Sequence, residues 1–299
     1  MAVITACRWQ CANDPGGGNM EEQAKKYVNE IDQGFGNTVE ITELLCDVQS
    51  AYQHIQIYQT ANLGKMLMLD GIVQLTEYDE FAYQEMMTHP AMFVHPNPEK
   101  VLIIGGGDGG VAREVARHKS VKAIEQCEID GKVIELCRKY IPSTACGFDD
   151  ERMNLVIGDG LKFVKEHKNE YDVIIVDSTD PIGPGEVLFG REFYESVHAA
   201  LKDNGVVASQ SESIFLYPDI VKRLYGFTRE LFQYNGYGFI AVPTYPAGSI
   251  GVCVASKAYP IKEPLRVPDE DLAKVLKYYT PEIHRSAFVL PKFTHSWFK

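Results

Sequence analysis

Two carboxylates, Asp177 and Asp180, stand three residues apart where the sequence predicts the end of a strand. Joint ionisation of such a pair is disfavoured, which raises the pKa of at least one member. A general base for an amine needs this property, because an ammonium group with a pKa near ~10.4 must lose a proton before its nitrogen can attack. We therefore interpret the pair as an acid–base site rather than as two caps in a proline-rich turn. The glycine- and proline-rich residues 182–186 predict a mobile lid over it.

A glycine-rich loop at residues 105–110 joins an apolar run to a stretch with helical spacing. Its glycines fit the pattern G-x-G-x-x-G, in which the absent side chains let the backbone turn sharply and let a ligand approach the helix. The acid in this loop, Asp108, is unusual, because a carboxylate there would repel a pyrophosphate. The loop therefore predicts a nucleoside site whose ligand carries positive charge.

Glu128 and Asp159 follow the next two predicted strands. Glu128 lies about 20 positions after Asp108, where a carboxylate can bind both hydroxyls of a ribose. We favour this role over helix capping, which suits Asp130 better. Asp159 lies between two glycines, and the pattern leaves open whether it caps a helix or accepts a hydrogen bond from an adenine amino group.

The segments that position these acids alternate between strand and helix. Apolar runs predict strands at 101–104, 123–127, 154–157, 173–176 and 206–209, and helical spacing occurs at 111–117, 130–140 and 161–166. This alternation predicts a parallel sheet covered on both faces, with the ligand beyond the carboxyl ends of the strands. Residues 240–242 and 251–255 predict a closing antiparallel pair.

The domain organisation follows from a change of pattern near residue 79. We interpret residues 1–26 as a flexible leader, 27–78 as a small β-sheet domain and 79–299 as the catalytic domain. Within the second segment, residues 27–31 predict a short helix. A further helix should begin at Asp79 and end at His89-Pro90.

The strands of the small domain are predicted by alternating apolar and polar residues at 38–44 and 54–58. The segments 65–69 and 72–75 flank Asp70-Gly71, which is a strong signal for a tight hairpin turn.

The composition excludes several classes of protein. A net charge of -12 argues against nucleic acid or an anionic membrane as the main partner and is compatible with a cationic substrate. No apolar run approaches the ~18 residues needed to span a bilayer, and the seven scattered cysteines predict reduced thiols in a cytoplasmic protein. The histidines lack the spacing of a metal site, and no G-K-[ST] motif for a nucleoside triphosphate is present.

A set of motifs resembles the spermidine synthases, the polyamine aminopropyltransferases. The segments GGGDGG, CEID, GDG, DSTDPIGP and PTYPAGSIG occur in this order, with DEFAYQE before them and KYY near the end. The resemblance covers about residues 52–291, and GGGDGG together with DSTDP is specific to that family. It implies an α/β fold with a Rossmann-like, methyltransferase-type doubly wound sheet and a small N-terminal β domain.

The resemblance also implies a reaction. The aminopropyl group of decarboxylated S-adenosylmethionine would pass to putrescine, giving spermidine and methylthioadenosine, with no metal and no cofactor. Asp177 would accept the proton of the attacking amine. The donor would contact Gln53, Gln74, Asp108, Glu128, Asp159, Gly160 and Pro184, and the diamine would contact Tyr83, Gln84, Asp177, Asp180 and Tyr245. The N-terminal β domain would pair two subunits into a homodimer.

Two regions depart from the family pattern. A tryptophan–phenylalanine pair and a W-P-G-Q run are replaced by Tyr27-Val28 and by residues 34–37, and Phe215 stands where tryptophan is common. These departures leave the length of the acceptor open. The alternatives are an aminopropyltransferase with another acceptor, such as a spermine synthase, and a diamine N-methyltransferase. The complete set of carboxylates argues against an inactive protein that keeps the fold.

Overall fold

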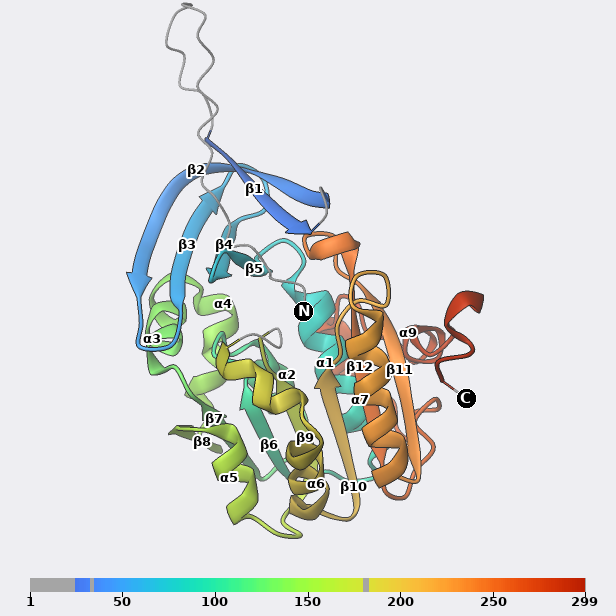
Figure 1. Ribbon diagram of the computed structural model, residues 1–299. Coiled ribbons are helices and arrows are strands. Elements are labelled where there is room, and N and C mark those ends of the chain that lie inside the picture. Colours follow the sequence, from blue (N-terminus) through green and yellow to red (C-terminus); the bar gives the residue numbers. More distant parts are fainter. Residues whose placement is uncertain (1–24, 33–34, 180–182, 299) are drawn as a thin grey trace, which may run out of the picture. The chain divides into compact units, whose positions relative to one another are not determined.

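The computed structural model describes residues 25–32, 35–179 and 183–298 (Figure 1). The chain divides into two compact units. The N-terminal unit comprises the residues up to Asp79 together with Thr244–Pro246, and the α/β unit comprises Glu80–Pro243 and the residues from Ala247 onward.

The N-terminal unit is built on an antiparallel sheet in which the five strands follow their order in the chain. The strands are β1 (Lys25–Asp32), β2 (Phe35–Gln49), β3 (His54–Thr60), β4 (Lys65–Leu69) and β5 (Ile72–Thr76). Side chains from β2 to β5, among them Ile41, Tyr58 and Met66, form its apolar core.

The predicted hairpin at Asp70-Gly71 is confirmed. Both residues have positive φ, 49° and 81°, as a type I′ turn requires. The helix predicted at residues 27–31 is wrong, because this segment is strand β1, in which Tyr27 pairs with Val39 of β2. Pairing along a neighbouring strand outweighs a short helical spacing. Strand β2 continues to Gln49, beyond the predicted end at 44. The prediction ended early because irregularities in the register of β2 against β3 interrupt the alternation of apolar and polar residues.

The α/β unit contains a seven-stranded sheet in the order β11-β12-β10-β9-β6-β7-β8. The strands are β6 (Lys100–Gly105), β7 (Ala123–Glu128), β8 (Met153–Ile157), β9 (Tyr171–Asp177), β10 (Leu201–Gln210), β11 (Tyr234–Ala241) and β12 (Ser249–Ser256). Strands β6 to β10 are parallel and β11 and β12 form an antiparallel pair, as the pattern predicted. The order reverses between β6 and β9, which is where doubly wound sheets bind ligands.

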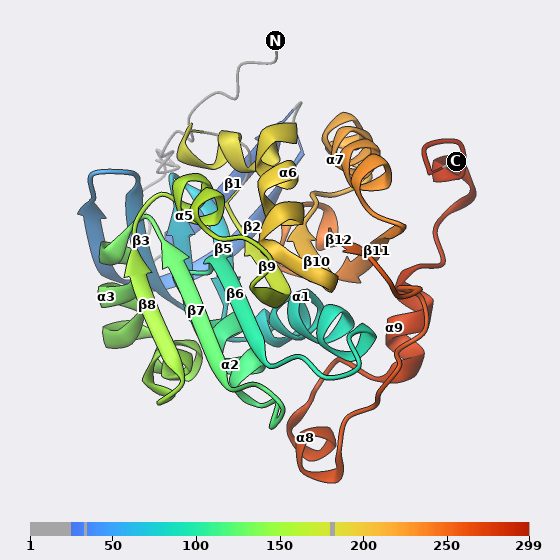
Figure 2. The ribbon, with the colours of Figure 1, turned by 90° about the horizontal axis from the view of Figure 1, so that it is seen from below.

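Helices cover both faces of this sheet, with α1 and α2 on one face and α5, α6 and α7 on the other (Figure 2). The α-helices are α1 (Glu80–Val94), α2 (Gly110–Ala116), α3 (Gly131–Tyr140), α4 (Pro142–Ala145), α5 (Gly160–Glu166), α6 (Arg191–Ala200), α7 (Pro218–Leu231), α8 (Glu270–Val275) and α9 (Pro281–Ala287). The 3-10 helices are η1 (Cys146–Asp149), η2 (Gly183–Phe189), η3 (Pro246–Gly248) and η4 (Lys292–Thr294). None of the helices in the described part of the chain is long and apolar enough to cross a membrane.

Helix α1 continues past its predicted end at His89-Pro90 and reaches Val94. Proline removes one backbone hydrogen bond and strains the preceding turn. The four residues after Pro90 are all buried, with at most 1% of each exposed, so their packing outweighs this cost. Asp79, the predicted cap, lies in the N-terminal unit, where its carboxylate accepts hydrogen bonds from the hydroxyls of Thr76 and Thr244.

Candidate active site

The glycine loop between β6 and α2 packs against its protein neighbours without space for side chains. Gly105 has φ of 82°, and a Cβ there would overlap the backbone oxygen of Asp177 on the adjacent strand β9. The side-chain amide of Gln126 donates to the carbonyl oxygens of Gly105 and Gly106 at 2.7 and 2.8 Å. At the far end of the loop, a Cβ on Gly110 would overlap the side chain of Gln84. The glycines therefore fix the loop against the sheet and against α1.

Helix α1 brings two consecutive side chains to the acids of this loop and of β9. The hydroxyl of Tyr83 donates to Asp177 Oδ1 at 2.6 Å. The amide nitrogen of Gln84 donates to Asp108 Oδ1 at 2.9 Å, and the backbone N–H of Gly110 donates to the same oxygen at 2.8 Å. The α/β unit thus brings together four of the predicted residues: Tyr83, Gln84, Asp108 and Asp177.

Glu128 and Asp159 both lie at strand ends, and their local roles differ. Glu128 Oε1 accepts the backbone N–H of Asp130, and the position of a Cβ on Gly107 lies 3.2 Å from Glu128 Oε2, so this carboxylate stands against the glycine loop. Asp130 caps α3, as predicted. Asp159 caps α5 by accepting the N–H groups of Leu161 and Lys162 at one oxygen. Capping is therefore one role of Asp159, and contact with adenine stays a prediction.

Three of these carboxylates bind protons more tightly than usual. Burial, helped by the charge of Asp108, raises the pKa of Asp177 to about 8 although the Tyr83 hydrogen bond opposes it. Burial likewise raises the pKa of Glu128 to about 7 and that of Asp108 to about 6. The prediction that a carboxylate here has a raised pKa is confirmed, but the causes are burial and the loop acids. Asp180, the partner expected for Asp177, lies outside the described residues.

Several buried acceptor atoms near these acids have no hydrogen-bond partner among the described residues. They are Asp177 Oδ2, Gln84 Oε1 and Gln210 Oε1. Gln210 ends β10, the strand beside β9. A buried acceptor without a donor is costly, so such atoms indicate a ligand that brings N–H groups. Acceptors together with acids suit an amine or ammonium group.

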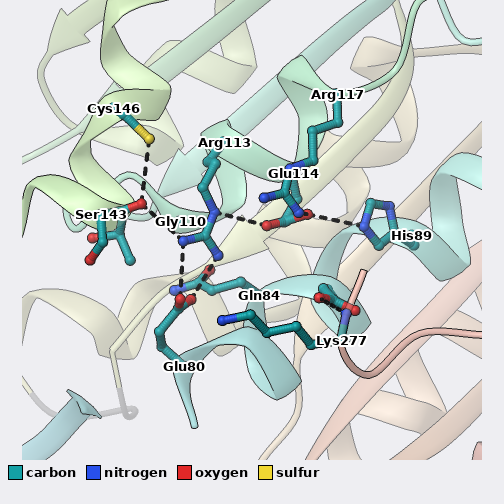
Figure 3. A network of polar contacts seen from close by, with 12 residues as sticks. Glu80, Gln84, His89, Gly110, Arg113, Glu114, Arg117, Ser143, Cys146 and Lys277 are labelled. Atoms are coloured by element: carbon teal, nitrogen blue, oxygen red, sulfur yellow. Dashed lines mark hydrogen bonds and ion pairs between the residues drawn. The ribbon is translucent and has the colours of Figure 1, made fainter. Parts of the chain in front are cut away.

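A buried ionic network holds α1 against α2 (Figure 3). Both terminal nitrogens of Arg113 donate to the carboxylate of Glu80, at 3.0 and 2.8 Å, and its Nε donates to Glu114 at 2.8 Å. Glu114 also pairs with His89 at 3.2 Å and with Arg117 at 2.6 Å. Because α1 carries Tyr83 and Gln84 and α2 follows Asp108, this network sets the relative position of these residues.

Comparison with known proteins agrees with this geometry. The family model described as the spermine/spermidine synthase domain matches residues 80–263, and the one described as the spermidine synthase tetramerisation domain matches residues 27–77. The chain belongs to the spermine/spermidine synthase family. The resemblance stated from the motifs is thereby confirmed, and the protein is an enzyme of the aminopropyltransferase class.

Individual relatives cover nearly the whole chain. The spermidine synthase of Dictyostelium discoideum is 44% identical over 266 residues, which is 89% of this chain and 94% of the relative. A polyamine aminopropyltransferase of Clostridium kluyveri is 46% identical over 260 residues, covering 86% and 92%. A crystal structure of spermidine synthase in complex with the transition-state analogue AdoDATO has a TM-score of 0.88 and 41% identity, covering 92% of this chain and 95% of that chain. The predicted Rossmann-like fold is confirmed by this similarity.

The remaining predicted site residues of this aminopropyltransferase belong to other elements of the chain. Gln53, Gln74 and Tyr245 belong to the N-terminal unit, where the hydroxyl of Tyr245 donates to the backbone oxygen of Gln74 at 2.6 Å. Gly160 is the first residue of α5, and Pro184 lies in η2, which occupies most of the predicted lid. Ile182, the first residue of that lid, lies outside the described residues.

Sequence reasoning missed Gln126, Gln210 and the network around Glu114. Gln126 lies in the predicted strand 123–127, Glu114 lies in the predicted helix 111–117, and Gln210 directly follows the predicted strand 206–209. The available signal was their polarity within otherwise apolar elements, since a buried polar group needs a partner or a ligand. Phe215 is 56% exposed and packs on Phe293 with ring centroids 5.5 Å apart.

Proposed function

We propose that this chain is a spermidine synthase that transfers the aminopropyl group of decarboxylated S-adenosylmethionine to putrescine. The observation that carries the proposal is the group of buried carboxylates and unpartnered acceptors around Asp177, in a member of the aminopropyltransferase family. Both substrates are cationic, and neither carries a phosphate that the loop acid would repel.

The reaction is a displacement at carbon. The neutral nitrogen of putrescine attacks the methylene carbon next to the sulfonium, the carbon–sulfur bond breaks, and its electron pair stays on sulfur. The products are spermidine and methylthioadenosine, and the proton lost by the nitrogen goes to Asp177. The pKa of Asp177, near 8, is closer to the pKa of an amine than that of an ordinary carboxylate is, and this suits the proton transfer. Holding nitrogen, carbon and sulfur in line supplies much of the rate.

The donor is assigned to the glycine loop and the adjacent strand ends. Glu128 would hold the ribose hydroxyls, Asp159 and Gly160 the adenine, and Asp108 the amine of the aminopropyl group. Two hydrogen bonds fix Asp108 Oδ1, and no described residue donates to its Oδ2. The second oxygen can therefore accept a hydrogen bond from the amine, which supports the last role. Gln53, Gln74 and Pro184 complete the proposed donor set.

The diamine is assigned to Tyr83, Gln84, Asp177, Asp180 and Tyr245. The Tyr83 hydroxyl orients the Asp177 carboxylate through their 2.6 Å hydrogen bond, which leaves the buried Oδ2 for the substrate nitrogen. Gln84 Oε1 is a second acceptor of the same kind. No metal or cofactor takes part in this scheme.

The test is mass analysis of the products formed from putrescine with each adenosyl donor. We expect spermidine and methylthioadenosine from decarboxylated S-adenosylmethionine and no product from S-adenosylmethionine. Methylated putrescine would instead establish an N-methyltransferase. A parallel reaction with spermidine as the acceptor separates the proposal from a spermine synthase, for which spermine would be the main product.

The assembly is a second point of the proposal. The family description of residues 27–77 as a tetramerisation domain supports an oligomer, whereas the resemblance of the motifs predicts a homodimer in the cytoplasm. The mass in solution distinguishes the two, because the assembly would have two or four times the 33.5 kDa of one chain.

A further inference from the structure

A cavity of about 110 Å³ lies in the α/β unit beside the C-terminal end of α2. The side chains that matter for its chemistry are those of Arg117, His118, Lys119, Ser120, Arg266 and Asp269. Residues 117–120 lead from α2 into β7, so they lie at the amino ends of the parallel strands. The candidate active site lies at the carboxyl ends, so the cavity is separate from it.

Two of the three cationic side chains that line the cavity are paired with carboxylates. Lys119 pairs with Asp269 at 3.0 Å and with Asp271 at 2.8 Å, and Arg117 pairs with Glu114 at 2.6 Å. The other oxygen of Asp269 caps α8 through backbone N–H groups. The third cation, Arg266, has no carboxylate partner among the described residues.

Arg266 is the side chain of this wall that most favours a bound anion. Its Nε and Nη2 donate to the backbone oxygens of His95 and Met92 at 3.0 and 2.6 Å, and its guanidinium lies 5.4 Å from the ring centroid of Phe93. No carboxylate pairs with it among the described residues, and burial lowers its pKa. A half-buried guanidinium without a counter-ion is unfavourable, and a bound anion would relieve this.

Neutral groups complete the wall. The hydroxyl oxygen of Ser120 is buried and has no hydrogen-bond partner among the described residues. His118 is 3% exposed, and burial holds its pKa well below the usual value, so its ring is neutral. Its Nε2 lies 3.0 Å from His89 Nδ1. The wall thus offers a guanidinium, an ammonium and a hydroxyl donor around a small space.

We propose that this cavity binds a small tetrahedral oxyanion of the phosphate class. A volume of about 110 Å³ has room for inorganic phosphate. Arginine is well suited to bind phosphate, because its planar guanidinium can donate two parallel hydrogen bonds to phosphate oxygens.

The experiment is a ³¹P NMR titration of the full chain with inorganic phosphate, at an ionic strength held constant with chloride. We expect saturable binding that is about tenfold weaker in the double variant Lys119→Gln/Ser120→Ala, because a charge-assisted hydrogen bond is lost. Lys122→Gln is the matched control: Lys122 is as exposed as Lys119, at 71% against 68%, and is also ion-paired, but it does not line the cavity.

The outcomes are distinct. Equal affinity in the wild type and the double variant would overturn the proposal, as would the absence of saturable binding. Ser120→Ala alone removes one buried hydroxyl and no charge, so it tests the site even if the double variant folds poorly. Neither residue belongs to the proposed active site, so turnover should be unchanged in both variants.

Discussion

Replacing Tyr83 with phenylalanine removes one hydrogen bond from Asp177 and keeps the aromatic ring. The hydroxyl lies 2.6 Å from Asp177 Oδ1, and both side chains are buried. Burial and the charge of Asp108 raise the pKa of Asp177, whereas this hydrogen bond favours the ionised form and lowers it. The variant should therefore have a still higher pKa at Asp177.

The size of the effect follows from the strength of the bond. A hydrogen bond to a charged group contributes about 1.5 to 3 kcal/mol, and one pKa unit corresponds to about 1.4 kcal/mol. The pKa of Asp177 should thus rise by about one to two units from its value of about 8. At pH 7 the ionised fraction, and with it kcat/KM, would fall by about 10- to 100-fold.

The assay is kcat/KM for putrescine as a function of pH, over about pH 6 to 10, since this profile reports the ionisation of the free enzyme. Titration of the substrate contributes equally in every variant, so the difference between profiles isolates the enzyme. Tyr194→Phe is the matched control, because its hydroxyl also makes a buried 2.6 Å hydrogen bond, but to Ser209 rather than to a carboxylate.

Coincident acidic limbs for the wild type and Tyr83→Phe would refute the reasoning. A reduction that is the same at every pH would also contradict it, because it would indicate a loss of positioning without a change in the ionisation of Asp177.

Five further predictions concern the same unit and its proposed chemistry. Asp177→Asn should lower turnover by at least about 10²-fold while largely sparing donor binding, and near-normal turnover would exclude Asp177 as the base. Gly110→Ala should destabilise the protein by about 1 to 3 kcal/mol in urea unfolding, because its Cβ would overlap Gln84. Gly226→Ala in α7, where a Cβ meets nothing within 4 Å, should stabilise it by about 1 kcal/mol. The pKa of Asp177 is about 8 in the folded state and 3.8 for an ordinary aspartate, so the folded state binds the proton more tightly. The free energy of unfolding should therefore fall as the pH rises from about 4 to about 8. The fall should be smaller in Asp177→Asn. Treatment with a chelator should leave activity intact, and a loss restored by a divalent cation would contradict the metal-free scheme.

The features that depend on neighbouring residues in the chain could be predicted from the sequence. The turn at Asp70-Gly71 needs only residues that accept positive φ, and the acids at strand ends follow from the alternation of strand and helix. The caps at Asp130 and Asp159 are local in the same sense.

Features that depend on packing could not be predicted in this way. Tyr83 and Gln84 were assigned only through the family resemblance, because the spacing of α1 does not show which side chains meet Asp177 and Asp108. The continuation of α1 past Pro90 also depends on packing, because the residues from Ala91 to Val94 are buried only once the helix packs on the sheet. Gln126 looks like any strand residue until its two bonds to the glycine loop are seen. The roles of these residues toward substrates remain predictions.

Helix α1 has almost no face toward solvent, since 14 of its 15 residues are buried. Its successive residues hold three separate parts of the α/β unit: Tyr83 holds Asp177, Gln84 holds Asp108, and Glu85 accepts the backbone N–H groups of residues 277–279. The amide protons of α1 can therefore reach water only when the unit opens as a whole. Their rate of hydrogen exchange would report the global stability of the unit, and a ligand that binds these carboxylates would slow that exchange by the factor 1 + L/Kd, where L is the free ligand concentration.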